Sequence, residues 1–348
     1  MNQVSSLDPL VSVDRLQKWY RIGNALFERN PAYLKAVNDV TFAIGHGETL
    51  GLVGESGSGK STVGRLLLRL ADLTSGQIVF DGTDVTNHSR RQLRPLRRRM
   101  QMVFQDPYSA LNPKMTIGQT ISAPLTINKL SASGRETEEK VREAMDLVGL
   151  NSRMCGRYPH EFSGGQRQRI SIARALITSP ELLVADEPVS ALDVSVQAQV
   201  IKLFQDVKKR FNLSMLFISH DLAVVGYVCD RIAVMYLGRI VEIAPTAELF
   251  QRPQHPYTEA LFSAVPEPSI GSKRKRIALS GDIPSPIDPP SGCAFRQRCP
   301  YALPKCATEV PLLRDVAPGH QKACVRDDLD LQNWGRHSSI TIRQAQSI

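Results

Sequence analysis

Short apolar runs recur along the chain, and each ends in glycine or polar residues. Runs of this kind are typical of strands that are buried on both faces of a parallel sheet. They lie at residues 48–53, 100–104, 181–185 and 214–218. Apolar residues at helical spacing follow the first run, at 63–68. The pattern therefore predicts an α/β fold with a largely parallel central sheet.

Other segments predict smaller structural units around this sheet. Apolar and polar residues alternate at 11–20, 40–44 and 76–82, which indicates strands of a small antiparallel layer with a polar excursion at 21–31. Residues 112–160 have helical patterning and lack strand signals. We expect this block to be a helical insertion into the sheet domain.

A glycine-rich segment connects the first apolar run to its helix. It consists of Gly54, Glu55, Ser56, Gly57, Ser58, Gly59, Lys60, Ser61 and Thr62, which fit the pattern G-x-x-x-x-G-K-[ST]. Glycines let successive backbone N–H groups point inward, and the helix N-terminus adds partial positive charge. We expect a cradle for nucleotide phosphates, in which Lys60 reaches the β- and γ-phosphates and Ser61 coordinates Mg²⁺.

Polar residues follow the other apolar runs, at the sheet edge where open α/β sheets bind ligands. Gln105 ends one run, and its amide is suited to contact Mg²⁺ or an attacking water. Asp186 and Glu187 end another; the first is suited to hold Mg²⁺ and the second to polarise the water. His220 follows a further run at the same edge, which favours a functional role over a structural one.

A second anion-seeking helix N-terminus is predicted at Ser163, Gly164, Gly165 and Gln166. One nucleotide rarely needs two such helix ends from one subunit. Upstream of the phosphate loop, Tyr20 is a candidate to stack on an adenine ring. Trp19 or Phe27 are alternatives for that role, and Tyr20 as a core residue is another.

Composition and charge limit the number of domains, the compartment and the binding partners that we expect. A chain of 348 residues with 42% hydrophobic residues is long enough for two domains and a packed core. It contains no apolar run long enough to span a bilayer, and its N-terminus does not resemble a signal peptide, so we expect a soluble intracellular protein. A net charge of +9 fits nucleic acid or an anionic membrane surface, although the basic block at 90–99 is typical of a solvated helix face.

Four of the six cysteines lie close together in the sequence. Cys155 and Cys229 are isolated, whereas the others are Cys293, Cys299, Cys306 and Cys324. In a reducing compartment such a group suggests a metal before disulfides. Its spacing matches neither the tight pairs usual for zinc nor the ferredoxin patterns, so the spacing leaves the metal open.

Together these motifs, with residues 190–193, resemble the nucleotide-binding subunit of an ATP-binding-cassette (ABC) transporter over about residues 11–250. In that family two subunits sandwich two ATP molecules head to tail, which gives the second helix end a role: residues 163–166 of one subunit bind the γ-phosphate held by the other. The resemblance implies the following roles: Tyr20 stacks on adenine, Gln105 senses the nucleotide and faces the membrane subunit, Asp186 holds Mg²⁺, Glu187 is the general base, Asp193 bridges the subunits, and His220 contacts the γ-phosphate and the attacking water.

Finer features are similar to the ATPase subunits of bacterial dipeptide and oligopeptide importers. These are residues 104–113, 255–261 and the Cys-rich extension, while residues 234–239 look like the second member of an ATPase pair. The resemblance implies a second, different ATPase, two permease subunits, an extracytoplasmic peptide-binding protein and a place on the cytoplasmic face of the inner membrane. It also implies a [4Fe–4S] cluster on Cys293, Cys299, Cys306 and Cys324, with zinc or no metal as alternatives.

The expected organisation is a nucleotide-binding domain at 1–250 with a helical subdomain at about 107–170, a small irregular Cys-rich domain at 251–330, and a tail at 331–348. A soluble ATPase acting on nucleic acid or ribosomes is the alternative of a different class. Such proteins usually carry two cassettes or a long coiled-coil insertion, and this chain has one cassette and no such insertion, so no nucleic-acid partner is expected. Another solute, such as nickel or glutathione, stays open within the same subfamily.

Overall fold

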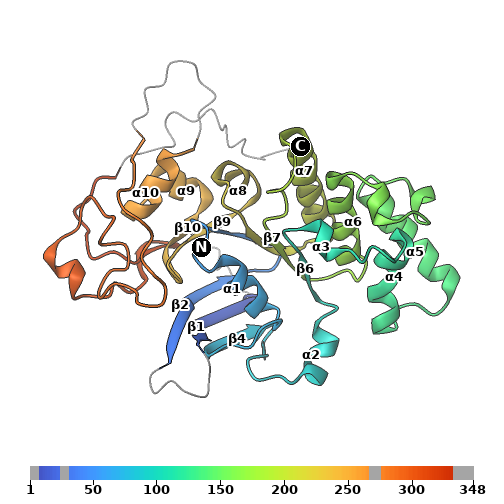
Figure 1. Ribbon diagram of the computed structural model, residues 1–348, viewed down its shortest axis with the longest axis horizontal. Coiled ribbons are helices and arrows are strands. Elements are labelled where there is room, and N and C mark those ends of the chain that lie inside the picture. Colours follow the sequence, from blue (N-terminus) through green and yellow to red (C-terminus); the bar gives the residue numbers. More distant parts are fainter. Residues whose placement is uncertain (1–7, 24–30, 266–275, 332–348) are drawn as a thin grey trace, which may run out of the picture.

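The structure is a computed structural model that describes residues 8–23, 31–265 and 276–331. Its strands form a four-stranded antiparallel sheet of order β2-β1-β4-β5 and an eight-stranded mixed sheet of order β11-β12-β10-β9-β3-β8-β7-β6 (Figure 1). The strands are β1 (Val11–Ile22), β2 (Ala32–Ile44), β3 (Thr49–Val53), β4 (Ser75–Phe80), β5 (Thr83–Asp84), β6 (Met100–Val103), β7 (Leu182–Asp186), β8 (Ser214–Ile218), β9 (Arg231–Tyr236), β10 (Arg239–Pro245), β11 (Arg314–Ala317) and β12 (His320–Lys322). The helices are α1 (Lys60–Leu67), α2 (Arg90–Leu96), α3 (Pro107–Ala110), α4 (Ile117–Asn128), α5 (Gly134–Leu147), α6 (Gly164–Leu176), α7 (Val194–Phe211), α8 (Leu222–Val228), α9 (Thr246–Gln251) and α10 (Pro256–Ser263), with short 3₁₀ turns η1 (Ser152–Met154), η2 (Pro159–Glu161) and η3 (Pro304–Ala307).

The centre of the large sheet is parallel, as the apolar runs predict. β3 pairs in parallel with β8 and β9, and β7 pairs in parallel with β6 and β8. Every residue of β3, β7 and β8 is buried. The carboxyl ends of these strands therefore meet at one edge, which is where the polar residues of the sequence motifs lie.

The two faces of the large sheet belong to two separate hydrophobic clusters. Leu50 and Leu52 face α1 and the antiparallel sheet, whereas Met215 and Phe217 of the neighbouring strand face the helices α7 and α8. Alternation of side chains across a strand produces this division. Helix α1 is thus held between the two sheets and carries the phosphate loop at its N-terminus (Figure 1).

The antiparallel layer is longer than its sequence pattern suggests. β2 begins at Ala32 instead of residue 40, and β1 extends to Ile22, so part of the expected polar excursion is strand. Irregularities in the β1–β2 pairing interrupt the register between Val13 and Trp19. Each bulge shifts the inward and outward alternation by one residue, which obscures the period of two.

The chain between β6 and β7 is helical, as predicted, and holds the elements α3, α4, α5, η1, η2 and α6. These helices pack on one another through a shared apolar centre that includes Ile121, Val141 and Met145. They lie at the right of Figure 1, beyond β6 and β7. The start of α6 is consequently carried by a different part of the molecule from the start of α1.

The C-terminal segment, residues 276–331, joins the large sheet through two short strands. Its strand β12 pairs with β10, and β11 pairs with β12. The junction holds a fully buried carboxylate, Glu242, which accepts hydrogen bonds from the backbone N–H groups of Gln254 (2.6 Å) and His255 (3.0 Å) and lies 2.7 Å from His320 Nε2. These partners compensate the burial of the carboxylate.

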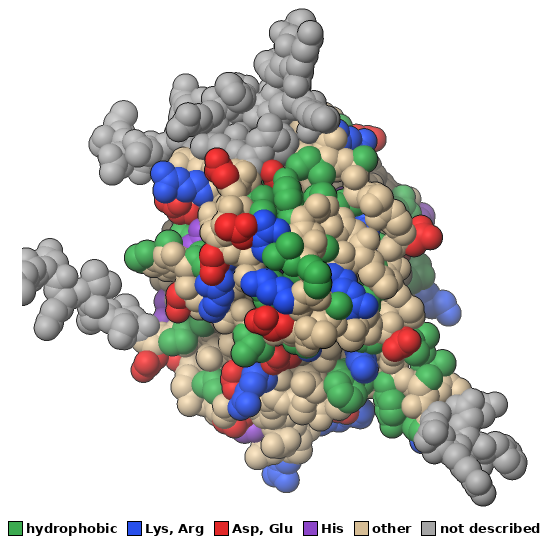
Figure 2. Space-filling view, turned by 90° about the vertical axis from the view of Figure 1, so that its left-hand side faces the viewer, with side chains coloured by type: hydrophobic (Ala, Val, Ile, Leu, Met, Phe, Trp, Pro, Cys, Tyr) green, Lys and Arg blue, Asp and Glu red, His purple; other side chains and the backbone are tan. Residues whose placement is uncertain are grey.

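The outer face of the C-terminal segment is mixed in charge. Figure 2 shows basic, acidic and apolar side chains interspersed on this side of the molecule. Asp327 pairs with Arg314 (2.5 Å) and Lys322 (3.0 Å), and Asp328 pairs with Arg326 (2.6 Å). Much of the positive charge here is therefore balanced locally, unlike the basic stripe that nucleic-acid recognition calls for.

Candidate functional site

The phosphate loop turns from β3 into α1 through positions that only glycine can occupy. Gly59 is the N-cap of α1 and has a φ of 104°. A Cβ atom at Gly59 would lie 2.1 Å from the Ala36 carbonyl oxygen, and one at Gly54 would lie 2.1 Å from the Met235 carbonyl oxygen. A side chain at either position would push the loop off its neighbouring strands.

Lys60 is held inside this loop. Its Nζ donates to the carbonyl oxygens of Gly54 (2.8 Å) and Glu55 (2.9 Å), and only 4% of the residue is exposed. Burial lowers the pKa of Lys60, while the charges of Glu187 and Asp186 oppose that shift. The ammonium group is thus the positive centre of a pocket that also contains two carboxylates.

Ser61 and Asp186 meet across the space between α1 and β7. The Ser61 hydroxyl donates to Asp186 Oδ1 over 2.8 Å, and Asp186 is 2% exposed. Burial raises the pKa of Asp186, which the hydrogen bond from Ser61 partly offsets. A hydroxyl and a carboxylate at the mouth of a phosphate loop are the oxygen ligands that Mg²⁺ favours.

Glu187 is the centre of a polar group at the same edge. Its backbone has a φ of 45°, and its N–H donates to the Ile218 carbonyl (2.9 Å), so the side chain leaves the end of β7 at a fixed angle. Gln105 Nε2 donates to Glu187 Oε2 over 2.8 Å, and His220 Nδ1 lies 3.4 Å from the same oxygen. The structure brings together three residues from three separate strand ends, as the sequence predicts.

The second predicted helix end is a capped and exposed one. Ser163 is the N-cap of α6; its hydroxyl accepts from the Gln166 N–H (3.4 Å), and the Gln166 side chain accepts from the Ser163 N–H (3.0 Å). A Cβ at Gly165 would lie 2.4 Å from Val196 of α7, so the segment packs against the start of that helix. Its first turn lies in the helical part of the chain and outside the cradle that surrounds Lys60 (Figure 1).

Asp193 and Tyr20 are both at the surface. Asp193 is the N-cap residue of α7 without a side-chain capping bond, and the neighbouring Val194 is 81% exposed. Tyr20 lies on β1 with 39% of its surface exposed, and Lys18 Nζ lies 4.9 Å from its ring centroid. Trp19 packs against Tyr33. Phe27, the other aromatic alternative, lies outside the described residues.

The four C-terminal cysteines gather in one region, but they are not arranged as metal ligands. All four are free thiols. Burial is the main reason why the pKa of Cys299 is raised to about 11, and the neighbouring Cys293, Cys306 and Cys324 also raise it. Among residues 8–23, 31–265 and 276–331, no group of three or more His, Cys, Asp or Glu side chains could hold a metal ion. The expected [4Fe–4S] or zinc site is therefore not supported by this arrangement.

Two residues that the sequence did not mark as site residues reach the phosphate loop. The Glu55 N–H donates to Tyr257 Oη of α10 (2.9 Å). Both terminal nitrogens of Arg298, in the C-terminal segment, donate to the Glu55 carboxylate, over 2.6 and 3.0 Å. A separation of 243 residues hides the second contact from any local pattern. A signal for Tyr257 existed in the 255–261 segment, but only as part of a resemblance.

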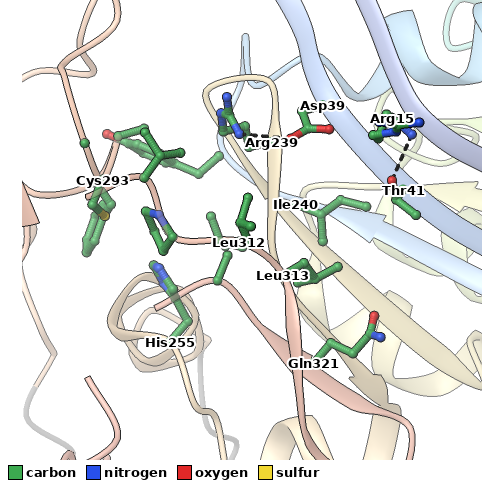
Figure 3. Close-up of a pocket in the computed structure, with 18 residues that line it drawn as sticks. Arg15, Asp39, Thr41, Arg239, Ile240, His255, Cys293, Leu312, Leu313 and Gln321 are labelled. Carbon is green, nitrogen blue, oxygen red and sulfur yellow. Dashed lines mark hydrogen bonds and ion pairs between the residues drawn. The ribbon is translucent and has the colours of Figure 1, made fainter. Parts of the chain in front are cut away.

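A pocket of about 270 Å³ lies between the C-terminal segment and both sheets (Figure 3). Arg15 and Asp39 come from the antiparallel layer, Arg239 from β10, and Cys293 and Leu312 from the C-terminal segment. Asp39 pairs with Arg239 over 3.5 Å. No residue of the phosphate loop or of the acidic strand end lines this pocket, so it is distinct from the nucleotide site.

Comparisons with known proteins agree with this geometry. The family profile described as "ABC transporter" matches residues 37–190, and the one described as "Oligopeptide/dipeptide transporter, C-terminal region" matches residues 241–306. A putative peptide import ATP-binding protein of Brucella ovis is 56% identical over 92% of this chain and 99% of its own length. The oligopeptide transport ATP-binding protein AppF of Bacillus subtilis is 51% identical over 91% of this chain and 97% of its own length.

Solved structures are similar over about two thirds of the chain. The dimeric post-hydrolysis state of the ATP-binding cassette MJ0796, bound to ADP and Pi, has a TM-score of 0.61 and 28% identity, and covers 68% of this chain and 98% of that one. CbiO1 from Clostridium perfringens, part of the transporter complex cbiONQ, has a TM-score of 0.60 and 26% identity, and covers 70% and 91%. In the part of this chain that the structure describes, no helix has both the length and the apolar character needed to cross a membrane.

Proposed function

The chain belongs to the ABC transporter family of ATP-binding proteins, and we propose that it is the ATP-hydrolysing subunit of an importer for dipeptides and oligopeptides. The observation that carries the hydrolytic part is the group formed by Glu187, Gln105 and His220 beside the Ser61–Asp186 pair. A base, two polar groups around it and a phosphate cradle are the parts that phosphoryl transfer to water needs.

Each residue has a role in this proposal. Lys60 and the loop N–H groups bind the β- and γ-phosphates, and Ser61 and Asp186 hold Mg²⁺, which neutralises charge on the phosphates when bound. Gln105 contributes its amide to the same edge. Glu187 accepts the proton of the attacking water, while Gln105 and His220 orient the carboxylate and the water. Tyr20 stacks on the adenine ring.

The other half of each site comes from a second subunit. Ser163 to Gln166 of one subunit close over the γ-phosphate held by the loop of the other, and Asp193 bridges the two. Support comes from the exposed positions of Ser163 and Asp193 and from the dimeric form of the similar cassette MJ0796. We propose that the second subunit is a different ATPase of the same family.

The proposed complex has further members. Two permease subunits in the cytoplasmic membrane contact this chain near Gln105, and an extracytoplasmic peptide-binding protein delivers the peptide. The subunit itself lies on the cytoplasmic face of the membrane. Support comes from the C-terminal profile match and from relatives described as peptide import ATP-binding proteins.

We propose from the family resemblance, and not from the thiol arrangement, that a metal binds Cys293, Cys299, Cys306 and Cys324, with a [4Fe–4S] cluster ahead of zinc; binding would have to draw the four thiols together, because the described residues do not form a metal site. Further support is chemical: the Sγ of Cys306 lies 3.5 Å from the Leu303 N–H, and that of Cys324 lies 3.4 Å from the Arg326 N–H. Donors of this kind stabilise thiolates. Anaerobic purification with iron, sulfide and zinc analysis tests it. Iron and sulfide with a visible absorption band support the cluster, and a colourless zinc-free protein contradicts any metal.

The direct test of hydrolysis is Glu187→Gln. Loss of a general base lowers turnover by about 10²–10⁴-fold, whereas ATP binding stays within about twofold because the phosphate cradle is unchanged. Glu143→Gln, an exposed residue of α5, is the matched control and leaves turnover unchanged. Turnover of the Glu187 variant at the wild-type rate would contradict the role.

The solute is tested on the purified transporter. The permeases and the second ATPase should co-purify with this chain, and the extracytoplasmic binding protein encoded with them should bind dipeptides or oligopeptides. Selective binding of nickel or glutathione by that protein would overturn the peptide assignment and leave the ATPase assignment intact. Co-purification of nucleic acid in place of permeases would overturn both.

A further inference from the structure

The C-terminal segment contacts the phosphate loop itself, and this contact is not part of the hydrolytic machinery described above. We propose that Arg298 is a positioning residue for the phosphate loop: through Glu55 it fixes the loop in its phosphate-binding shape and so sets the affinity for ATP. The inference rests on the proposed function, because the ligand of the loop is the phosphate chain of ATP.

Glu55 is bonded on three sides. Its carboxylate receives the two-pronged hydrogen bond from Arg298, its N–H donates to Tyr257 Oη, and its carbonyl oxygen accepts from Lys60 Nζ. The Ser58 N–H also donates to this carbonyl, over 3.2 Å. A shift of Glu55 therefore displaces the lysine and the next loop residues together.

Arg298 is well placed to restrain this residue. Its side chain is 7% exposed, whereas that of Glu55 is 27% exposed. A bidentate pair between guanidinium and carboxylate fixes direction as well as distance. Little solvent screening reaches the arginine, so the pair is stronger than an ordinary surface ion pair.

The arginine is supported by a cluster of aromatic side chains. Phe295 lies edge-on to Tyr236 with 5.3 Å between ring centroids, and Tyr257 lies 4.7 Å from Tyr236. The Arg298 guanidinium carbon is 5.9 Å from the Tyr236 centroid, and the Arg298 N–H donates to the Phe295 carbonyl (3.0 Å). These rings are buried and closely packed, which gives a rigid base to the Arg298–Glu55 pair, called the Arg298–Glu55 clamp below.

The expected effect separates binding from chemistry. Gln105, Glu187 and His220 lie at the ends of other strands and contact one another, whereas the Arg298 side chain bonds to Glu55. Turnover at saturating ATP is therefore expected to stay within about twofold when the arginine is removed. ATP binding is expected to weaken about five- to tenfold, since the loop then samples shapes that do not bind phosphate.

The experiment compares Arg298→Ala with Arg296→Ala in the full chain. Arg296 lies on the same turn but donates to Ser291 and not to the loop, which makes it a matched control. Titration with ATP and Mg²⁺ gives the dissociation constant, and steady-state hydrolysis gives KM and kcat. We expect a higher dissociation constant and KM for Arg298→Ala alone. Arg298→Lys should partly restore the affinity for ATP, because lysine supplies the charge but not the two parallel hydrogen bonds to Glu55.

A double-mutant cycle and a second contact complete the test. Glu55→Gln combined with Arg298→Ala should bind ATP no more weakly than Arg298→Ala alone, because both changes break one pair. If Arg298→Ala does not fold, Tyr257→Phe, which removes only the hydroxyl that accepts from Glu55, should weaken ATP binding two- to threefold, whereas Tyr301→Phe, which removes a hydroxyl bonded to Glu259, should not.

Two different failures can be told apart. Wild-type protein that does not bind ATP overturns the proposed function. Wild-type protein that binds ATP, with Arg298→Ala and Tyr257→Phe variants that bind it equally well, overturns the clamp alone. An equal loss of affinity in Arg296→Ala would show a general effect of the segment and also overturn the role of Arg298.

Discussion

The chain has two helix N-termini that suit an anion, and they are built differently. At the start of α1 the cap is Gly59, which has no side chain, and Lys60 and Ser58 behind it are buried. At the start of α6 the cap is Ser163, which is exposed, and its hydroxyl and the Gln166 side chain satisfy each other's backbone groups. One end is enclosed by its own subunit, and the other is presented to the outside.

The difference indicates which end holds the nucleotide and which end completes the site. Strand β9, helix α10 and the C-terminal segment all support the first end, through contacts on Gly54 and Glu55. The second end belongs to a helical group whose helix α6 contacts strand β6 of the large sheet and helix α7. A rigid, enclosed end is suited to bind ATP in an isolated subunit, whereas an exposed end acts only on a partner.

The largest effect is expected at the enclosed end. Lys60→Ala removes the positive charge that the phosphates need and leaves the Asp186 and Glu187 carboxylates uncompensated. We expect ATP binding by the isolated chain to weaken by about 100-fold or more. Titration with a fluorescent ATP analogue measures this, with Lys140→Ala, a residue in a surface ion pair, as the control. Undiminished binding would show that the loop is not the nucleotide site.

A substitution at the exposed end, the start of α6, should lower turnover without weakening ATP binding by the isolated chain. Ser163→Arg places a bulky side chain where the partner's γ-phosphate is expected, so turnover of the assembled ATPase should fall about 10- to 100-fold. ATP binding by the isolated chain should stay within twofold. Ser133→Arg, at the exposed N-cap of α5, makes the same change on a helix without this role. If the isolated Ser163 variant binds ATP more weakly, the N-termini of α1 and α6 both belong to one nucleotide site within one chain, which would contradict a site shared between subunits.

A substitution of Asp186 tests how the burial of its carboxylate affects the free energy of unfolding. Its folded pKa is raised by burial, so the protonated form favours folding; that contribution is complete below the ordinary pKa of 3.8 and is lost as pH rises through the folded pKa. Asp186→Asn should therefore stabilise the metal-free protein at pH 7 by about 1 kcal/mol, with the gain vanishing near pH 4. Urea unfolding in EDTA at the two pH values measures it. An equal gain in stability at pH 7 and near pH 4 would show that the raised pKa of Asp186 is not its cause.

The smallest effect is expected from the cap of α6. Ser163→Ala removes the hydroxyl that accepts from the Gln166 N–H and should cost about 0.5–1 kcal/mol in the free energy of unfolding. Ser133→Ala at the start of α5 should cost a similar amount, because its hydroxyl also accepts from an N–H in the first turn, that of Glu136 (3.2 Å). Denaturant unfolding compares the two. A much larger cost at Ser163 would show that its side chain supports more than a helix end.

Most of the enclosed end was predictable because its signals are local. The buried strand, the glycines and the apolar face of α1 lie within one short stretch, and the acidic end of β7 directly follows its apolar run. Parallel strands bring such ends to one edge, so the grouping of Gln105, Glu187 and His220 follows from topology. The fold class is confirmed for the same reason.

The contacts made by the C-terminal segment were not predictable. β12 is only three residues long, His320 and Lys322 on it are buried, and a polar strand of that length carries no period of two. Its pairing with β10 depends on the buried Glu242, and the clamp on Glu55 depends on Arg298, far away in sequence. Long-range polar pairs of this kind leave no pattern within a single segment. The metal expected on the four cysteines came from the family resemblance and not from their spacing, and the described thiols do not form a metal site.

The most direct test of a site shared between subunits is the turnover of ATP measured on samples whose mass is known. The chain is diluted in series, alone and with its partner ATPase, and each sample is examined by sedimentation and by hydrolysis at saturating ATP and Mg²⁺. We predict that the monomer binds ATP but hydrolyses it at less than about a tenth of the rate per subunit reached in the dimer. A strictly monomeric sample that hydrolyses ATP at the full rate would contradict the account.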